Sequence, residues 1–192
     1  TLGASLPDIF AVFVDMGECV AQRFRPTLRD FAKARVGLFD APLLAYVGSG
    51  FIRRGVATAL AAIAPFPQVY LAIVGTDRHV ERYGRLAERL GVGERVRFLG
   101  VVPNVRPLYG AADAFILPSL YDAFPHTCAE AFASGLPVFT TPTCGAAEWV
   151  RQGENGWVIV ARDVEGYRAA LAEWMQRRAD WPAMREAAHQ AA

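Results

Sequence analysis

The sequence predicts an α/β fold in which a doubly wound, Rossmann-like parallel sheet of about six strands lies between two layers of helices. Short apolar runs alternate with longer amphipathic runs from Leu43 to about Arg178. Several short runs, such as Leu71–Val74, are apolar at every position. Continuous apolarity indicates strands buried on both faces, as in a parallel sheet covered by helices.

The expected strands end at turn residues, and they are Leu43–Val47, Val69–Val74, Arg95–Leu99, Ala114–Leu117, Pro137–Thr140 and Trp157–Val160. The expected helices are amphipathic, and they are Gly55–Ala64, Val80–Leu90, Val105–Ala112, His126–Ser134, Ala146–Arg151 and Val164–Arg177. Gly91 and Gly135 follow two of these helices as stop signals. These elements define a domain over 43–178. A further helix is expected over 179–192, capped by Asp180, and 1–42 is interpreted as an interdomain segment with an entering strand near Ile9–Val14.

Composition limits the functions that the chain can have. Hydrophobic residues make up 53% of its 192 residues, and 20 basic against 19 acidic residues leave a net charge of +1, which gives nucleic-acid binding no support. Cys19, Cys128 and Cys144 lack metal-binding spacing, so no metal site or disulfide framework is expected and a reducing, cytoplasmic compartment is favoured. The most apolar stretch, Ala59–Gly75, is too short and interrupted for a membrane span.

A glycine-rich turn, Gly48–Gly55, follows the first expected strand. It does not match a dinucleotide fingerprint, because Arg53 replaces the third glycine, nor a Walker loop, because no lysine follows Gly55. Free backbone amides and a helix start favour an anion, and Arg53 and Arg54 add two permanent charges that suit phosphate. The alternative is a solvated loop with two surface arginines.

Two carboxylates, Asp122 and Glu130, flank the start of the helix expected at His126. At different depths of one cleft, they would suit a long ligand with several hydroxyl pairs, such as a nucleotide sugar. Glu130 would then hold ribose hydroxyls and Asp122 sugar hydroxyls. The alternative is that Asp122 caps the helix and Glu130 points to solvent.

Six stretches, in order, resemble the C-terminal domain of retaining glycosyltransferases of family four, which have two facing Rossmann-like domains (the GT-B fold). The matching stretches are 46–55, 95–100, 111–119, 122–131, 133–138 and 145–156. Residues 12–26 resemble the family's interdomain segment. The Gly-Ser-Gly-Phe and Thr-Cys-Gly stretches are similar to lipopolysaccharide-core glucosyltransferases.

The resemblance implies roles for individual residues. Arg53 and Arg54 would bind the donor diphosphate, and Glu130, the second glutamate of the family's E-x7-E pattern, would hold ribose. Asp122 stands where the family has the first glutamate, which shortens the reach of that carboxylate to the donor sugar. The remaining donor contacts would come from loop positions, which are Gly48, Ser49, Gly50, Leu99, Gly100, Val101, Ala123 and Phe124.

The function implied is the donor half of a metal-independent, retaining glycosyltransferase that uses a UDP- or GDP-sugar and needs no cofactor. The acceptor-binding N-terminal domain would be missing, so this fragment is expected to be inactive alone. Any peripheral membrane contact would come through that domain. Two alternatives remain, a non-catalytic nucleotide-sugar-binding module and a nucleotide-sugar epimerase of the same fold. The departure at Asp122 favours the first alternative.

Overall fold

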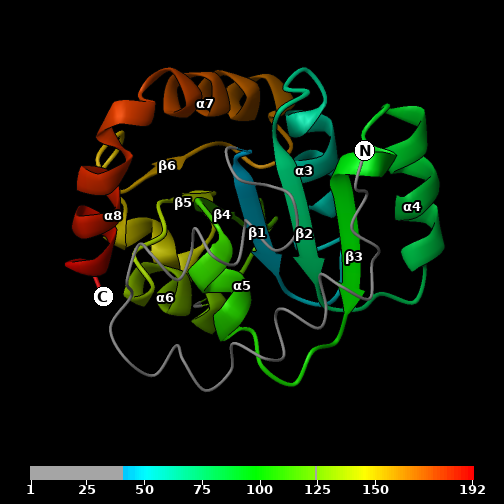
Figure 1. Ribbon diagram of the computed structural model, residues 1–192. Coiled ribbons are helices and arrows are strands. Elements are labelled where there is room, and N and C mark those ends of the chain that lie inside the picture. The colour runs from blue at the N-terminus through cyan, green and yellow to red at the C-terminus, as the bar shows by residue number, and fades with distance from the viewer. Residues whose placement is uncertain (1–40, 124) are drawn as a thin grey trace.

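A single six-stranded sheet forms the centre of the molecule, in a computed structural model that describes residues 41–123 and 125–192 (Figure 1). Its strands are β1 (Leu43–Val47), β2 (Tyr70–Val74), β3 (Val96–Gly100), β4 (Ala114–Ile116), β5 (Val138–Thr140) and β6 (Gly156–Val158). All neighbours pair in parallel in the order β3-β2-β1-β4-β5-β6. This confirms the predicted six-stranded, doubly wound fold.

Helices cover both faces of the sheet (Figure 1). They are α3 (Val56–Ile63), α4 (Val80–Arg89), α5 (Arg106–Ala111), α6 (His126–Ala133), α7 (Val164–Gln176) and α8 (Trp181–His189), with short 3₁₀ turns η2 (Gly93–Arg95), η3 (Gly145–Trp149) and η4 (Arg178–Asp180). On one side α3 packs against both α4 and α7, while on the other α6 packs against α8.

Two local expectations are corrected by the structure. The helix expected over Ala146–Arg151 is the 3₁₀ turn η3. Asp180 does not cap α8 through its side chain, because its carboxylate accepts a hydrogen bond from the Arg177 Nε at 3.0 Å. The Arg177 guanidinium therefore binds the carboxylate that was predicted to cap the helix. The other predicted boundaries agree to within about two residues, the usual uncertainty of helix and strand ends.

Aromatic side chains fill the core beside β5 and β6. Trp157 stacks on Phe139 with ring centroids 4.7 Å apart, and Trp174 stacks on Trp181 at 4.3 Å. Trp157 and Trp174 are fully buried, which fits packing roles. Across residues 41–123 and 125–192, no helix is both long and apolar enough to cross a bilayer. The strand expected near Ile9–Val14 lies outside the described residues.

The strand order reverses at β1, which pairs with β2 on one side and with β4 on the other. Ligands of doubly wound folds bind at this point, outside the carboxyl ends of the strands. The loop after β1 meets the loop after β4 directly, because the Leu120 amide donates to the Arg53 carbonyl at 2.7 Å. The fold therefore brings the glycine-rich turn to the loop that carries Asp122.

Candidate functional site

Backbone hydrogen bonds fasten the glycine-rich turn to the neighbouring strand ends. The Gly48 amide donates to Val74 at 2.8 Å, and the Gly50 amide to Thr76 at 3.0 Å. The Gly75 amide donates in turn to the Gly100 carbonyl at 2.7 Å. The loops after β1, β2 and β3 consequently form one continuous edge, which holds the predicted donor-binding residues Gly48, Gly50 and Gly100.

The other loop residues predicted at this edge are half-buried or exposed. The Ser49 hydroxyl accepts a hydrogen bond from the Thr76 amide at 3.0 Å, so it helps to fix the turn. Leu99 is half-buried in β3, and Val101, just after that strand, is 73% exposed. Ala123 is exposed in the loop that follows β4, and Phe124 lies outside the described residues.

Arg54 lies across the surface of Gly48. A Cβ built on Gly48 would lie 2.5 Å from the Arg54 Cδ, closer than real Cβ contacts come. Since Gly48 has no side chain, the guanidinium can cross the turn and reach the loop after β4. A side chain at position 48 would require Arg54 to take another path.

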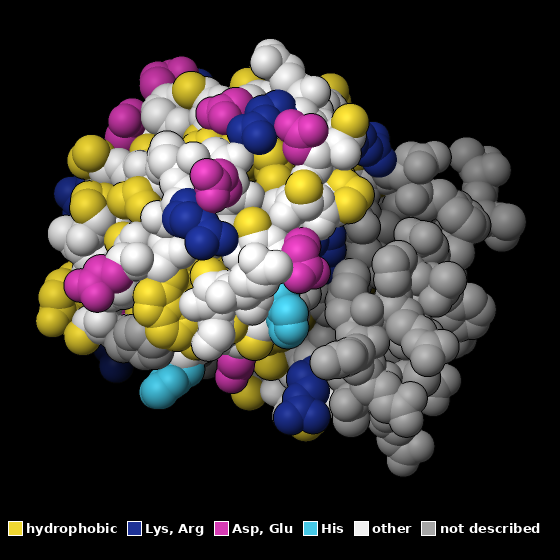
Figure 2. All heavy atoms as spheres, turned by 90° about the vertical axis from the view of Figure 1, so that its left-hand side faces the viewer, with side chains coloured by type: hydrophobic (Ala, Val, Ile, Leu, Met, Phe, Trp, Pro, Cys, Tyr) yellow, Lys and Arg dark blue, Asp and Glu magenta, His cyan; other side chains and the backbone are white. Residues whose placement is uncertain are grey.

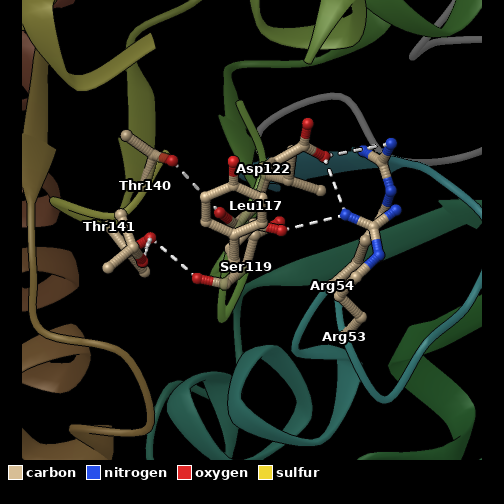
Figure 3. A network of polar contacts seen from close by, with 9 residues as sticks. Arg53, Arg54, Leu117, Ser119, Asp122, Thr140 and Thr141 are labelled. Atoms are coloured by element: carbon tan, nitrogen blue, oxygen red, sulfur yellow. Dashed lines mark hydrogen bonds and ion pairs between the residues drawn. The ribbon is translucent and has the colours of Figure 1, made fainter. Parts of the chain in front are cut away.

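Arg53 and Arg54 both form ion pairs with the carboxylate of Asp122 (Figure 3). The Asp122 Oδ2 lies 3.1 Å from Arg54 Nη2 and 3.4 Å from Arg53 Nη1. Arg53 also donates to the Tyr121 carbonyl at 2.9 Å. The side chain of Asp122 is only 11% exposed, whereas that of Arg53 is 51% exposed. The structure thus gathers the three residues predicted as catalytic, which come from two loops far apart in the sequence.

Arg54 retains hydrogen-bonding capacity after this ion pair. Its Nε and Nη1 atoms are buried and have no hydrogen-bond partner among the described residues. Leaving buried N–H donors of a cation unpaired costs about 1–3 kcal/mol or more. A guanidinium with two unpaired donors, at the ligand-binding edge of a doubly wound sheet, fits an anionic ligand that would complete its bonding.

The loop of Asp122 is held rigidly by the loop after β5. The Asp122 amide donates to the Thr143 carbonyl at 3.2 Å, and its carbonyl accepts from the Gly145 amide at 2.9 Å. Thr141 Oγ1 supports this arrangement by donating to the Ser119 carbonyl at 2.7 Å (Figure 3). The helix α6 has Pro125 at its N-cap and no side-chain cap, so the alternative in which Asp122 caps this helix is wrong.

Glu130 lies on α6 and is exposed, but it does not point freely to solvent. Its Oε2 accepts a hydrogen bond at 2.9 Å from the hydroxyl of Tyr109 on α5, which also approaches the Thr127 carbonyl at 3.3 Å. Burial, and then the Glu130 charge, raises the pKa of Tyr109, so this hydroxyl stays protonated and donates. Tyr109 therefore holds one carboxylate oxygen of Glu130 by a hydrogen bond, while the other oxygen accepts no hydrogen bond from the described residues.

Tyr109 and Asp77 also shape this edge, although the sequence reasoning gave neither of them a role. Tyr109 carried no signal, because its position in an apolar helix resembles ordinary packing. Asp77 follows Gly75 at the end of β2, and its carboxylate accepts from the Phe51 amide at 2.7 Å and the His79 amide at 2.8 Å. A carboxylate at a strand end, opposite a glycine-rich turn, was the available signal for a residue that fixes this turn. Within 41–123 and 125–192, no group of three His, Cys, Asp or Glu side chains is placed to hold a metal ion.

Comparisons with known proteins identify the family of this chain. The family model described as "Glycosyl transferases group 1" matches residues 29–192. This chain belongs to the glycosyl transferases group 1 family. Among its relatives, the lipopolysaccharide core biosynthesis glycosyltransferase LpsE of Rhizobium meliloti is 35% identical over 69% of this chain. The lipopolysaccharide glucosyltransferase WaaG of Escherichia coli is 34% identical over 70%.

Solved structures with the same fold include those of known glycosyltransferases. A crystal structure of WaaG, a glycosyltransferase involved in lipopolysaccharide biosynthesis, matches 88% of this chain with a TM-score of 0.79 and 30% identity. Anabaena HepE, solved in complex with UDP and glucose, matches with a TM-score of 0.79 at 22% identity, a likeness of fold alone. The chain spans 39% of LpsE, 37% of WaaG and 48% of the WaaG structure. Less than half of each of these relatives is therefore represented, which agrees with one half of a GT-B fold.

Proposed function

We propose that this chain is the donor-binding domain of a retaining glycosyltransferase, which transfers a sugar from a nucleoside-diphosphate sugar to a glycan or lipid-linked acceptor. The observation that carries the proposal is the guanidinium of Arg54. It lies at the strand-order reversal, crosses a glycine that leaves room for it, and has two buried nitrogen atoms, Nε and Nη1, without hydrogen-bond partners among the described residues. Family membership supports the same assignment.

The arginine pair fits the chemistry of the leaving group. When the bond from the sugar to the nucleoside diphosphate breaks, negative charge grows on the diphosphate. Fixed cations at that place stabilise the transition state more than the ground state. Arg53 and Arg54 supply two such charges, so the reaction that we propose needs no metal ion and no cofactor.

Glu130 is the proposed ribose contact. Because the Tyr109 hydroxyl donates a hydrogen bond to one carboxylate oxygen of Glu130, the second oxygen is available to accept hydrogen bonds from ribose hydroxyls. Gly48, Ser49, Gly50, Ala123 and Phe124 would surround the diphosphate and sugar, and Leu99, Gly100 and Val101 would flank the base. We propose a UDP- or GDP-sugar as the donor.

The acceptor side belongs to the other domain of the whole enzyme. The relatives named above are a lipopolysaccharide core biosynthesis glycosyltransferase and a lipopolysaccharide glucosyltransferase, so a lipid-linked saccharide is the proposed acceptor. We propose that the enzyme is cytoplasmic and that any contact with a membrane is made through the acceptor domain. A two-domain active site is complete only when both walls are present, so the chain alone should bind donor weakly and transfer no sugar.

One observation favours a second candidate, a nucleotide-sugar-binding module without catalysis. Asp122 is bound to the very arginines that would hold the diphosphate. Its carboxylate is one methylene shorter than the glutamate of the family pattern and is turned to the cations rather than to a sugar. Turnover by the whole enzyme separates the candidates, since Asp122→Glu should increase transfer from a measurable baseline if the protein is catalytic.

Calorimetric titration of the chain with UDP tests the donor site. We expect Arg54→Ala to weaken UDP binding by about 1.5–3 kcal/mol, the range for a hydrogen bond to a charged group. Arg151→Ala is the matched control, since Arg151 pairs with Glu154 at 3.1 Å, away from the strand ends. Equal UDP affinity in both variants would remove Arg54 from the site and with it the main support for the proposal.

A further inference from the structure

Two free cysteines meet behind the loop that carries Asp122. Cys128 lies in the first turn of α6, and Cys144 lies in the loop after β5, directly before η3. The thiol of Cys128 donates a hydrogen bond to the sulfur of Cys144. Both side chains are buried, with exposed fractions of 0% and 1%. Because the two residues belong to different elements, the fold rather than local spacing brings their sulfur atoms together.

Cys144 has the surroundings of a reactive thiol. The Cys128 thiol, which has the largest effect, and the Ala146 backbone amide donate hydrogen bonds to its sulfur, and they lower the pKa of Cys144 to about 6. Burial, followed by the hydrogen bond to Cys144, instead raises the pKa of Cys128 well above its usual value. The thiolate is the form of cysteine that attacks an oxidant. Cys144 is therefore the nucleophile of this pair, and Cys128 is placed to react with its oxidised form.

The cysteine pair is joined to the candidate donor site through the backbone. Cys144 and Asp122 form a parallel β-bridge, and the two hydrogen bonds on either side of Cys144 measure 3.2 and 2.9 Å. Cys128 lies on α6, the helix that also carries Glu130. A covalent bond between the two sulfur atoms would thus connect the segment that holds Asp122 to the helix that carries Glu130.

A small oxidant can reach the pair through the turn that covers it. Pro142 and Thr143, directly before Cys144, are exposed, so local opening of this short turn uncovers the Cys144 sulfur. On the face beside α8, basic and acidic side chains are interspersed, which is the ordinary state of a protein surface (Figure 2). Because the two thiols lie below the surface, a small neutral oxidant fits the pair better than a protein partner does.

We propose that Cys128 and Cys144 form a site of reversible oxidation, which hydrogen peroxide converts to an intramolecular disulfide. The Cys144 sulfur attacks one peroxide oxygen and the O–O bond breaks, which gives a sulfenic acid. The hydroxide that leaves combines with the proton that Cys144 lost on ionisation. The Cys128 sulfur then attacks the Cys144 sulfur, the S–O bond breaks, and the Cys128 proton leaves with the hydroxide as water. Two thiols thus lose two electrons, and one peroxide is reduced to two molecules of water.

This disulfide is regulatory rather than structural. In the reducing, cytoplasmic compartment proposed above, disulfides are transient and serve catalysis or redox sensing. A dithiol reductant reverses the reaction by thiol–disulfide exchange. Bond formation draws the two sulfur atoms to about 2.05 Å, much closer than a hydrogen-bonded contact. The movement is shared by α6 and the Asp122 loop, so oxidation should weaken UDP binding, an effect that rests on the proposed donor function.

Peroxide treatment of the reduced 192-residue chain tests the site. Mass spectrometry of unreduced peptides should show a Cys128–Cys144 disulfide, which dithiothreitol removes. Cys128→Ser should stop at a Cys144 sulfenic acid, which dimedone labels, whereas Cys144→Ser should give neither product. Cys19→Ser, at a position outside the described residues, is the matched control and should form the disulfide like the wild type. Thermal melting of every variant checks that it is folded.

Three outcomes of this experiment contradict the proposal. A folded chain that forms no Cys128–Cys144 bond, or forms it only in denaturant, overturns the site. A disulfide through Cys19 in its place overturns the pairing. Dimedone labelling of Cys128 in Cys144→Ser, at the rate seen for Cys144 in Cys128→Ser, overturns the assignment of Cys144 as the nucleophile.

Calorimetry with UDP, on the reduced and the oxidised chain, measures the effect on the donor site. We expect about 2- to 10-fold weaker binding after oxidation, the worth of one hydrogen bond, and full recovery with dithiothreitol. Peroxide should leave the affinity of Cys144→Ser unchanged. A disulfide that forms without altering UDP affinity overturns the regulatory role. A reduced chain that does not bind UDP contradicts the donor function instead, and the disulfide, which mass spectrometry measures separately, then stands without it.

Discussion

Asp122 forms ion pairs with both Arg53 and Arg54, so removing its charge should strengthen the binding of UDP. Its carboxylate lies 3.1 Å from Arg54 and 3.4 Å from Arg53. A diphosphate that binds the same guanidinium groups must either displace this carboxylate or accept its repulsion. Asp122→Asn keeps the size of the side chain and one acceptor oxygen but removes the competing charge.

The size of the effect follows from the geometry. A phosphate on the far side of the guanidinium groups would lie roughly 6 Å from the Asp122 carboxylate, where two unit charges repel by about 0.7 kcal/mol in water and about 3 kcal/mol at an effective dielectric constant of about 20. The Arg53 side chain is 51% exposed, so solvent screening favours the lower part of this range. We therefore expect a gain of about 1–2 kcal/mol, or roughly 5- to 30-fold tighter UDP binding.

Calorimetry with UDP, inorganic pyrophosphate and UDP-glucose is the assay. The affinities for UDP and for pyrophosphate should increase by the same factor in Asp122→Asn, because both ligands contain the diphosphate. The affinity for UDP-glucose should increase less. If Asp122 accepts hydrogen bonds from sugar hydroxyls, asparagine at this position makes those bonds less well. Glu154→Gln, which removes one acidic charge beside Arg151, controls for net charge. UDP affinity that is unchanged or weaker in Asp122→Asn would refute the view that this carboxylate competes with the diphosphate.

Three more predictions test the surroundings of the site. Tyr109→Phe should weaken UDP about 2- to 10-fold, the loss of one hydrogen bond, while pyrophosphate binding stays constant; a parallel loss for pyrophosphate would contradict a ribose-specific role. Gly48→Ala should displace the Arg54 side chain and weaken UDP as Arg54→Ala does, whereas Gly84→Ala, where a Cβ meets nothing within 4 Å, should not. A hydrogen bond from the Cys128 thiol lowers the pKa of Cys144 from 9.0 to about 6, so ionisation of Cys144 stabilises the folded chain increasingly as pH rises from about 6 to 9, and this contribution is lost as pH falls through 6. Thermal midpoints of wild type and Cys144→Ala should diverge over that window, and parallel curves would contradict the assignment.

Local sequence patterns determined the elements of the fold. Short, mostly apolar runs predicted all six strands. Several of them, such as Leu71–Val74, are apolar throughout because a strand buried on both faces leaves no position for a polar side chain. The expected strand Arg95–Leu99 contains two arginines, and β3 is accordingly half-buried. Gly91 and Gly135 have positive φ after α4 and α6, which fits their predicted role as stop signals. Asp180 is a residue whose role local sequence patterns did not predict correctly. A carboxylate next to a helix start is a good cap, but Arg177 competes for it, and geometry decides between them.

The sequence by itself indicated which residues could contact a nucleotide sugar: a glycine turn and two arginines for its phosphates, and two carboxylates for its hydroxyls, in an order that resembles one family. Only the tertiary structure decided that both arginines face Asp122, that Tyr109 holds Glu130, and that Cys128 contacts Cys144. Each of these groups joins residues from separate loops or helices. Spacing along a chain fixes neighbours within a few positions, whereas contacts between loops depend on the order in which strands pair, and here that order reverses at β1.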